Sequence, residues 1–386
     1  MKRVFPALLA LLCLLATPAA AAGESAVPPP ASLTLSAPAA LLMEKTTGAI
    51  LYEQGAHTQY EPASVTKVMT LLLVMEAIDS GALDWEEPVT ASARACSMGG
   101  SQIWLKENET LTVREMVKAV TVASANDCSV ALAEHLAGSE EAFVARMNQR
   151  AHQLGMEHTT FLNCTGLPAP GHVTCAHDIA LMSRELILRH PAIREFTTIW
   201  MDTLRDGQFQ LTNTNKLVRF FEGTTGLKTG STDGALYCIS ATAERDGMEL
   251  IAVVLHAPTP DQRFDDARAL LSHGFANYTL LPVYPDQVIP PVPVLLGEAD
   301  AVQPVPGRAC AVLLPKAQAG QVTTRVTVAP SVEAPVEPGQ KLGELTVYAD
   351  GTPLDTIDLI AAAPVERLGL WGIFRQLLAI LFMADT

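Results

Sequence analysis

Residues 62–78 read PASVTKVMTLLLVMEAI, a polar start followed by a long apolar run. Apolar residues recur between Val65 and Ile78 too densely for a helix on a protein surface, so we predict a central, buried helix. Positions three apart lie on one face of a helix, which puts Lys67 one turn after Ser64. The stretch therefore predicts a serine and a lysine side by side at the start of a buried helix.

This pair has the residue types of an activated nucleophile. A serine hydroxyl attacks poorly until a base removes its proton, and lysine is such a base only when it is neutral. Burial in an apolar helix lowers a lysine pKa because it disfavours the ammonium form. The helix amino terminus also favours negative charge that develops near Ser64. In the alternative interpretation, Ser64 only caps the helix and Lys67 is a solvated charge.

Two further motifs follow, Ser124-Ala125-Asn126 and Lys228-Thr229-Gly230. If the first motif is extended, Ser124 and Asn126 point the same way. We then expect Ser124 to relay a proton and the Asn126 amide to hold a peptide group of a substrate. The alternative is that one of them caps the next helix, which we predict from Ser129 to Ala137.

The lysine motif is predicted at the start of a strand. We expect this strand to pair with Glu249–His256, with a turn at Asp246-Gly247 between them. Gly230 has no side chain, so a ligand can lie close to the strand backbone. Lys228 and Thr229 then offer a charge and a hydroxyl to an anionic terminus. The alternative is an ordinary solvated lysine at a strand start.

The chain before residue 282 mixes strands with helices. Apolar runs at Ala40–Met43 and Ala49–Tyr52 flank Gly48, which predicts a β-hairpin. Thr112 followed by Glu115 predicts a helix start with a capping box. We therefore expect an α/β (α+β) catalytic domain over residues 37–281.

The amino terminus has the pattern of an export signal. The basic pair Lys2-Arg3 precedes an apolar run, Val4–Ala16, and then small residues. The run is shorter than the roughly 20 residues that a spanning helix needs, so we predict a cleaved signal peptide over residues 1–22, with an uncleaved anchor as the alternative. A Pro-rich linker is expected over residues 23–36. The protein should therefore be exported to the extracytoplasmic face of the cytoplasmic membrane or the cell wall.

Composition excludes some partners. A formal net charge of -15 argues against nucleic acid, because phosphate binding needs clustered Lys and Arg. The chain has 7 cysteines, and without Cys13 of the leader six remain, which can pair in fifteen ways that the sequence does not distinguish. Their spacing matches neither a zinc knuckle nor Cys-x-x-Cys, so we expect no metal and no cofactor.

Prolines cluster at the start of residues 282–363, where helical periodicity ends. Alternating segments at Val322–Val328, Leu342–Tyr348 and Leu354–Ile360, with a turn at Asp350-Gly351, predict a small all-β domain of sandwich type.

The tail, residues 364–386, is predicted to be an amphipathic helix. Its apolar part, Leu368–Met383, is too short to span a bilayer comfortably, yet Trp371 and Phe374 suit a membrane interface. We expect the helix to lie on the membrane surface. The alternative is a short helix packed against its own protein.

The ordered set of three motifs resembles that of the D-alanyl-D-alanine carboxypeptidases, which are low-molecular-mass penicillin-binding proteins. The resemblance covers nearly the whole chain and implies a β-lactamase/transpeptidase-like catalytic domain with an antiparallel sheet and helices, followed by the β domain. By resemblance, Ser64 is the acylated nucleophile and Lys67 is the base. Ser124, Asn126 and Lys228 complete the site.

The resemblance also implies finer roles. The backbone amides of Ser64 and Ser231 would form an oxyanion hole, which supplies donors where negative charge appears. Arg263 is similar to a family arginine that helps to hold the terminal carboxylate of the substrate. Ser231 is smaller than the residue expected there, which bears only on fine substrate preference.

The reaction implied is removal of the last D-alanine from peptidoglycan stem peptides ending in D-Ala-D-Ala, through an acyl-enzyme on Ser64. β-Lactams would acylate the same serine and act as inhibitors. A β-lactamase is the alternative enzyme, but its usual Glu-x-x-Leu-Asn motif does not occur here. An exported wall-binding or penicillin-binding protein without turnover is the alternative from another class.

Overall fold

The computed structural model describes residues 33–381, except 319 and 321. The expected signal peptide and most of the expected linker lie outside the described residues.

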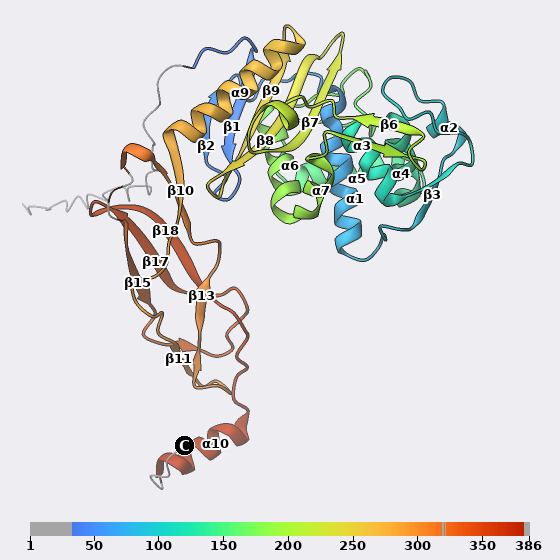
Figure 1. Ribbon diagram of the computed structural model, residues 1–386. Coiled ribbons are helices and arrows are strands. Elements are labelled where there is room, and N and C mark those ends of the chain that lie inside the picture. Colours follow the sequence, from blue (N-terminus) through green and yellow to red (C-terminus); the bar gives the residue numbers. More distant parts are fainter. Residues whose placement is uncertain (1–32, 319, 321, 382–386) are drawn as a thin grey trace, which may run out of the picture. The chain divides into compact units, whose positions relative to one another are not determined.

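The amino-terminal region of the described chain is built on one antiparallel five-stranded sheet in the order β2-β1-β9-β8-β7 (Figure 1). The predicted hairpin around Gly48 is confirmed, because it joins β1 to β2. β1 lies between β2 and β9 and is buried along its whole length. The five strands are β1 (Ala39–Glu44), β2 (Ile50–Gln54), β7 (Thr224–Thr232), β8 (Leu236–Arg245) and β9 (Met248–Ala257).

Helices cover both faces of this sheet (Figure 1). α9 (Pro260–Asn277) packs on one face, in an apolar cluster that includes Leu42. α1 (Lys67–Asp79) and α6 (Ala176–Arg189) pack on the other face, in the cluster that includes Leu41. Neighbouring residues of a strand point to opposite faces, so β1 contributes to both cores.

α1 is the buried central helix that the sequence predicts. Every residue from Lys67 to Met75 is buried. A short 3₁₀ helix, Ala63–Thr66, leads into it, so Ser64 lies in the 3₁₀ turn and Lys67 is the first residue of α1. The two side chains are therefore one turn apart, as expected.

The predicted capping box is also confirmed. The Thr112 side chain accepts a hydrogen bond from the Glu115 amide, and the Glu115 carboxylate accepts one from the Thr112 amide. The other elements of the region are α2 (Ala93–Cys96), α3 (Val113–Val122), α4 (Asn126–Ala137), α5 (Glu140–Gln153), α7 (Arg194–Thr197), α8 (Leu217–Phe220), the 3₁₀ helix Pro191–Ile193, and the short strands β3 (Pro88–Thr90), β4 (Thr110–Thr112), β5 (Met201–Leu204) and β6 (Phe209–Thr212).

The predicted partner of the lysine-motif strand is wrong. β7, which contains this motif, pairs with β8 and forms an edge of the sheet, whereas β8 pairs with β9. The chain reverses at Asp233-Gly234, a residue pair that is typical of tight turns between strands. The turn predicted at Asp246-Gly247 does exist, and it joins β8 to β9.

The helix predicted from Ser129 begins earlier. α4 starts at Asn126, and Ala125 is its capping residue without a side-chain hydrogen bond. Ser124 has a φ of +62°, so the segment is not extended. Neither Ser124 nor Asn126 therefore caps the helix with its side chain, and the geometry expected for an extended motif is absent.

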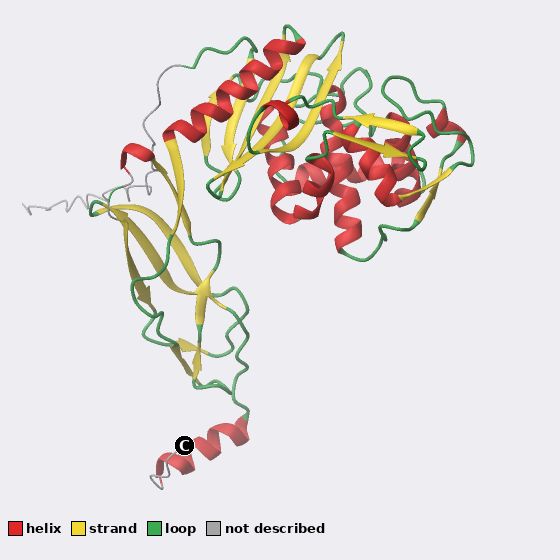
Figure 2. Ribbon diagram, viewed as in Figure 1, coloured by secondary structure: helices red, strands yellow, loops and turns green. Residues whose placement is uncertain are grey.

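The C-terminal region consists mainly of strands, as predicted (Figure 2). Its sheets have the orders β13-β18-β17-β15 and β12-β11-β16, and β10 pairs with β14. The predicted turn at Asp350-Gly351 joins β17 to β18. The strands are β10 (Tyr278–Pro282), β11 (Val292–Leu295), β12 (Ala301–Val302), β13 (Pro304–Pro306), β14 (Ala311–Pro315), β15 (Val322–Val328), β16 (Val332–Glu333), β17 (Lys341–Ala349) and β18 (Thr352–Ala361), with a 3₁₀ helix at Lys316–Gln318.

The last element is α10 (Leu370–Leu381). Its large apolar residues Leu370, Trp371, Phe374 and Leu377 are exposed. Among the helices of the described residues, none combines the length and the apolar character needed to cross a bilayer.

Candidate active site

Lys67, the first residue of α1, lies at the centre of a cluster of polar groups. Its Nζ atom lies 2.9 Å from Ser64 Oγ, 2.6 Å from Asn126 Oδ1 and 2.7 Å from the carbonyl oxygen of Thr165. Burial lowers the pKa of Lys67 to about 7, although the nearby Cys164 and Asp127 oppose this shift. A buried amine with this pKa is partly neutral at neutral pH and can exchange a proton with the serine.

The turn that carries Ser64 is enclosed by backbone on two sides. A Cβ atom on Gly230 would lie 2.7 Å from the Ser64 amide nitrogen, and one on Gly166 would lie 1.8 Å from the Ala63 carbonyl oxygen. Both glycines are therefore required by close packing against this turn. The sequence predicts that Gly230 lets a ligand lie close to the strand, and the structure adds this contact with the chain itself.

Asn126 and Ser124 differ in how they join the cluster. Asn126 accepts from Lys67 through Oδ1 and donates from Nδ2 to the Gly99 carbonyl oxygen at 2.7 Å, so its amide orientation is fixed. Ser124 Oγ is buried and finds no hydrogen-bond partner among the described residues. The structure thus links Asn126, but not Ser124, to Lys67 by a hydrogen bond.

The edge strand β7 supplies the lysine motif. Lys228 is buried, and its Nζ donates to the Thr229 carbonyl oxygen at 2.9 Å. Burial, followed by the positive charges of Lys67 and Arg263, lowers the pKa of Lys228 well below its ordinary value. Thr229 Oγ1 donates to Thr214 Oγ1 at 2.7 Å, and Ser231 is exposed two positions further along the strand.

Arg263 reaches β7 from the first turns of α9. Its Nη1 donates to the carbonyl oxygens of Gly230 and Cys238, at 3.3 and 3.5 Å, and its guanidinium lies 4.4 Å from the centre of the Phe264 ring. Burial lowers its pKa to about 10. Arg263 therefore brings a positive charge close to Lys228 at the edge strand, so an incoming carboxylate is favoured electrostatically and would in turn favour the charged form of Lys228.

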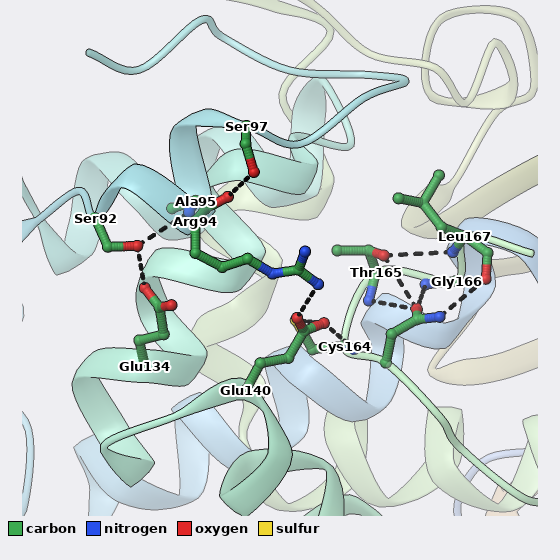
Figure 3. A network of polar contacts seen from close by, with 11 residues as sticks. Ser92, Arg94, Ala95, Ser97, Glu134, Glu140, Cys164, Thr165, Gly166 and Leu167 are labelled. Carbon is green, nitrogen blue, oxygen red and sulfur yellow. Dashed lines mark hydrogen bonds and ion pairs between the residues drawn. The ribbon is translucent and has the colours of Figure 1, made fainter. Parts of the chain in front are cut away.

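Sequence reasoning missed the Thr165 carbonyl oxygen as a partner of Lys67. Asn163 Oδ1 accepts from the Thr165 amide, the Thr165 hydroxyl and the Gly166 amide, at 3.1, 3.0 and 2.7 Å. These bonds fold residues 163–167 into a tight loop, part of which Figure 3 shows. The Asn-x-Thr-Gly sequence is the signal that indicates such a turn, but a backbone acceptor leaves no residue signature of its own.

A second contact that the sequence does not predict holds this loop, at residue Glu140. Glu140 accepts from the Cys164 amide at 3.3 Å and from Arg94 Nη2 at 3.0 Å (Figure 3). Glu140 begins α5 and Arg94 belongs to α2, so the contact ties two helices to the loop that faces Lys67. The three residues are far apart in the sequence, and no local pattern predicts their meeting.

A serine hydroxyl beside a buried amine, at the start of a helix that packs on an antiparallel sheet, is the arrangement of a serine-type hydrolase. The family model described as D-alanyl-D-alanine carboxypeptidase matches residues 24–259, and a model described as penicillin-binding protein 5, C-terminal domain, matches residues 279–367. The chain therefore belongs to the D-alanyl-D-alanine carboxypeptidase family. The family and the enzyme class predicted from the sequence are confirmed.

Related proteins and solved structures are similar to this chain over most of its length. D-alanyl-D-alanine carboxypeptidase DacF of Bacillus subtilis (strain 168) is 38% identical over 374 residues, 96% of this chain and 96% of the relative. Penicillin binding protein 5 from Haemophilus influenzae is 28% identical, with a TM-score of 0.76 over 87% of this chain and 99% of that chain. Penicillin-Binding Protein D2 from Listeria monocytogenes, in its ampicillin-bound form, is 37% identical, with a TM-score of 0.58 over 64% of this chain and 100% of that chain.

Proposed function

We propose that this enzyme removes the terminal D-alanine from peptidoglycan stem peptides by acyl transfer to Ser64. Ser64 Oγ bonds to the penultimate carbonyl carbon while its proton passes to Lys67. The amide bond then breaks, and the proton taken up by Lys67 passes to the departing D-alanine amine, with the Ser124 hydroxyl as the proposed relay, so that Lys67 is neutral again. Water hydrolyses the ester and restores the serine. β-Lactams acylate the same hydroxyl and inhibit the enzyme.

One observation carries this assignment, the set of acceptors around Lys67. A neutral amine has two N–H donors and one lone pair. Asn126 Oδ1 and the Thr165 carbonyl oxygen are acceptors only, at 2.6 and 2.7 Å, so they take the two N–H groups. The lone pair is then left for the hydroxyl proton of Ser64, 2.9 Å away. This arrangement supports Lys67 as the base.

The remaining residues of the proposed site bind the substrate. Lys228, Thr229 and Arg263 attract the terminal carboxylate, Asn126 holds a peptide group, and β7 presents its edge near Gly230. We assign the oxyanion hole to the backbone amides of Ser64 and Ser231, because Gly230 packs against the Ser64 amide and Ser231 is its neighbour on β7. Ser231 itself is exposed and would line the rim of the site.

Mass spectrometry tests the assignment directly. Incubation with a peptide ending in D-Ala-D-Ala should give loss of one alanine, and benzylpenicillin should add its mass to the chain at Ser64. Ser64→Ala should abolish both results, whereas Ser231→Ala should still be acylated. Penicillin adducts that turn over rapidly would favour a β-lactamase. Penicillin binding without any peptide product would favour a protein that binds without turnover.

We further propose that the protein acts outside the cytoplasm. The basic and apolar pattern of residues 1–22 supports a cleaved export signal. We propose domain limits of 37–281 for the catalytic part and 282–363 for the β part, and membrane contact through α10 within residues 364–386. The exposed Trp371 and Phe374 support the membrane contact, because aromatic rings suit the interface.

A further inference from the structure

Two histidines and one cysteine meet outside the candidate active site. The side-chain donor atoms of His57, His158 and Cys175 all lie within 4.8 Å of one another. His57 follows β2, His158 follows α5, and Cys175 is the capping residue of α6. His57 is exposed, His158 is half-buried and Cys175 is buried, so the cluster is open to solvent on one side.

Local contacts hold two of these residues in place. Cys175 Sγ accepts a hydrogen bond from the Asp178 amide at 3.4 Å, as a helix cap. The Asp178 carboxylate accepts from the His158 amide at 2.8 Å and from the Thr159 hydroxyl at 2.7 Å. The segment that carries His158 is thus tied to the first turn of α6. Burial raises the pKa of the Cys175 thiol, so a metal ion would have to displace a bound proton there.

His57 is brought to the cluster by the loop after β2. Its ring lies 5.3 Å from the ring of His158 and 4.7 Å from that of His177, between ring centres. The backbone nearby is also paired, because the His177 amide donates to the Ala56 carbonyl oxygen at 3.0 Å. His57 is therefore positioned by the contacts of its own ring and by the hydrogen bond of the preceding residue, Ala56.

We propose that His57, His158 and Cys175 bind one divalent transition-metal ion of the Zn²⁺ type, with water at the fourth position. Two imidazole nitrogens and a thiolate suit such an ion, whereas Mg²⁺ and Ca²⁺ prefer oxygen ligands. Tetrahedral Zn²⁺ holds its nitrogen and sulfur ligands about 3.4–3.7 Å apart, from bond lengths of about 2.0–2.3 Å. The three donor atoms, which all lie within 4.8 Å of one another, would close to that spacing when the ion binds. The metal–sulfur bond replaces the thiol proton, which leaves to solvent.

The ion would join three segments that are distant in the sequence. One of them leads from His57 through Tyr60, which pairs with Thr174 beside Cys175, toward the Ser64 turn. The bound ion would therefore stabilise the support of the active site without taking part in acyl transfer. The sequence predicts no metal, because the ligands of this site form no short motif and the six cysteines alone match no metal pattern.

Cobalt(II) absorption tests the proposal on the reduced, chelator-treated full chain. One equivalent of Co²⁺ should give a thiolate-to-cobalt charge-transfer band, which Zn²⁺ should displace. Cys175→Ser keeps a helix-cap acceptor and should lose the band. His57→Gln and His158→Gln should weaken Zn²⁺ binding about tenfold to hundredfold or more. Zn²⁺ should also raise the thermal unfolding midpoint of the unaltered chain, but not that of Cys175→Ser.

Matched controls keep the test decisive. Cys310→Ser alters a half-buried thiol outside the cluster, and His152→Gln alters an exposed histidine of α5. Both should retain the band and the affinity. Penicillin acylation of each variant reports that it is folded. The proposal is overturned if the unaltered chain gives no band, if the band survives Cys175→Ser, or if both histidine variants bind Zn²⁺ as the unaltered chain does.

Discussion

At the scale of single residues, the proposed acyl transfer depends on which acceptors take the N–H groups of Lys67. The sequence predicts that Lys67 is buried and stands one turn from Ser64, and both points are confirmed. The two acceptors that orient the amine differ in origin. Asn126 belongs to a recognisable motif, whereas the Thr165 carbonyl oxygen is backbone and is positioned by a folded loop.

Acylation of Ser64 should depend on pH through Lys67. The pKa of Lys67 is lowered to about 7 by burial, so the amine is protonated below that pH and neutral above it. The rate constant of benzylpenicillin acylation should rise as pH increases from 5 to 7 and then level off, with about a tenfold loss per pH unit on the acid side. Stopped-flow or quenched mass spectrometry measures this profile. A rate that falls as pH rises through 7 would contradict the role of Lys67.

Asn126→Asp should displace this profile to higher pH. A carboxylate 2.6 Å from Lys67 would favour the ammonium form and raise the lysine pKa by about 1–3 units. Acylation at pH 7 should then be slower and should recover at alkaline pH. Asn126→Ala is the matched control, since it removes the amide without adding charge, and it should slow acylation without moving the inflection upward. An unchanged inflection in Asn126→Asp would argue against this coupling.

At the scale of elements, the sequence correctly predicts those helices and turns that depend on residues close together in the chain. The dense apolar run gave α1, Gly48 marked the first hairpin, and Thr112 with Glu115 marked the start of α3. The predicted partner of β7 is wrong because the turn at Asp233-Gly234 divides this stretch into two strands, so β7 pairs with its hairpin neighbour β8. The start of α4 was late because Ala125 caps it without any side-chain signal.

Gly230→Ala tests the packing of β7 against the Ser64 turn. The added Cβ would lie 2.7 and 2.9 Å from the amide nitrogens of Ser64 and Val65, which are backbone atoms that cannot rotate away. We expect a destabilisation of about 1–3 kcal/mol, measured by urea unfolding, together with slower penicillin acylation. Gly99→Ala is the control, because a Cβ there meets nothing within 4 Å. Equal stability and acylation of Gly230→Ala and the unaltered chain would contradict this account.

At the scale of the whole molecule, a change in amino-acid composition marks where the mixed helix-and-strand region ends and the β region begins. The change to Pro-rich and then alternating sequence predicted the β region, and the second family model matches residues 279–367. Long-range contacts leave no local sequence signal, because residues such as Arg94, Glu140 and Cys164 come together only after the helices have packed. The same holds for His57, His158 and Cys175.

Removal of α10 should reduce membrane binding and leave the active site intact. Val365 is buried in the core of the β region and the Leu368 amide donates to the Leu296 carbonyl oxygen, so the cut belongs after Leu368. The truncated chain should remain in the supernatant when it is centrifuged with phosphatidylglycerol-containing vesicles, whereas the longer chain should sediment. The double variant Trp371→Ala/Phe374→Ala should sediment weakly. Equal sedimentation of all three chains would contradict the membrane role, and equal penicillin acylation would show that they are folded.

The two glycines that enclose the Ser64 turn limit how this enzyme could escape an antibiotic. A single substitution at Gly166 or Gly230 forces a side chain into backbone and so harms the native enzyme as well as drug capture. Ser231, in contrast, is exposed on β7 and has room for larger side chains. Laboratory selection for drug-insensitive variants should therefore recover changes at Ser231 and spare both glycines.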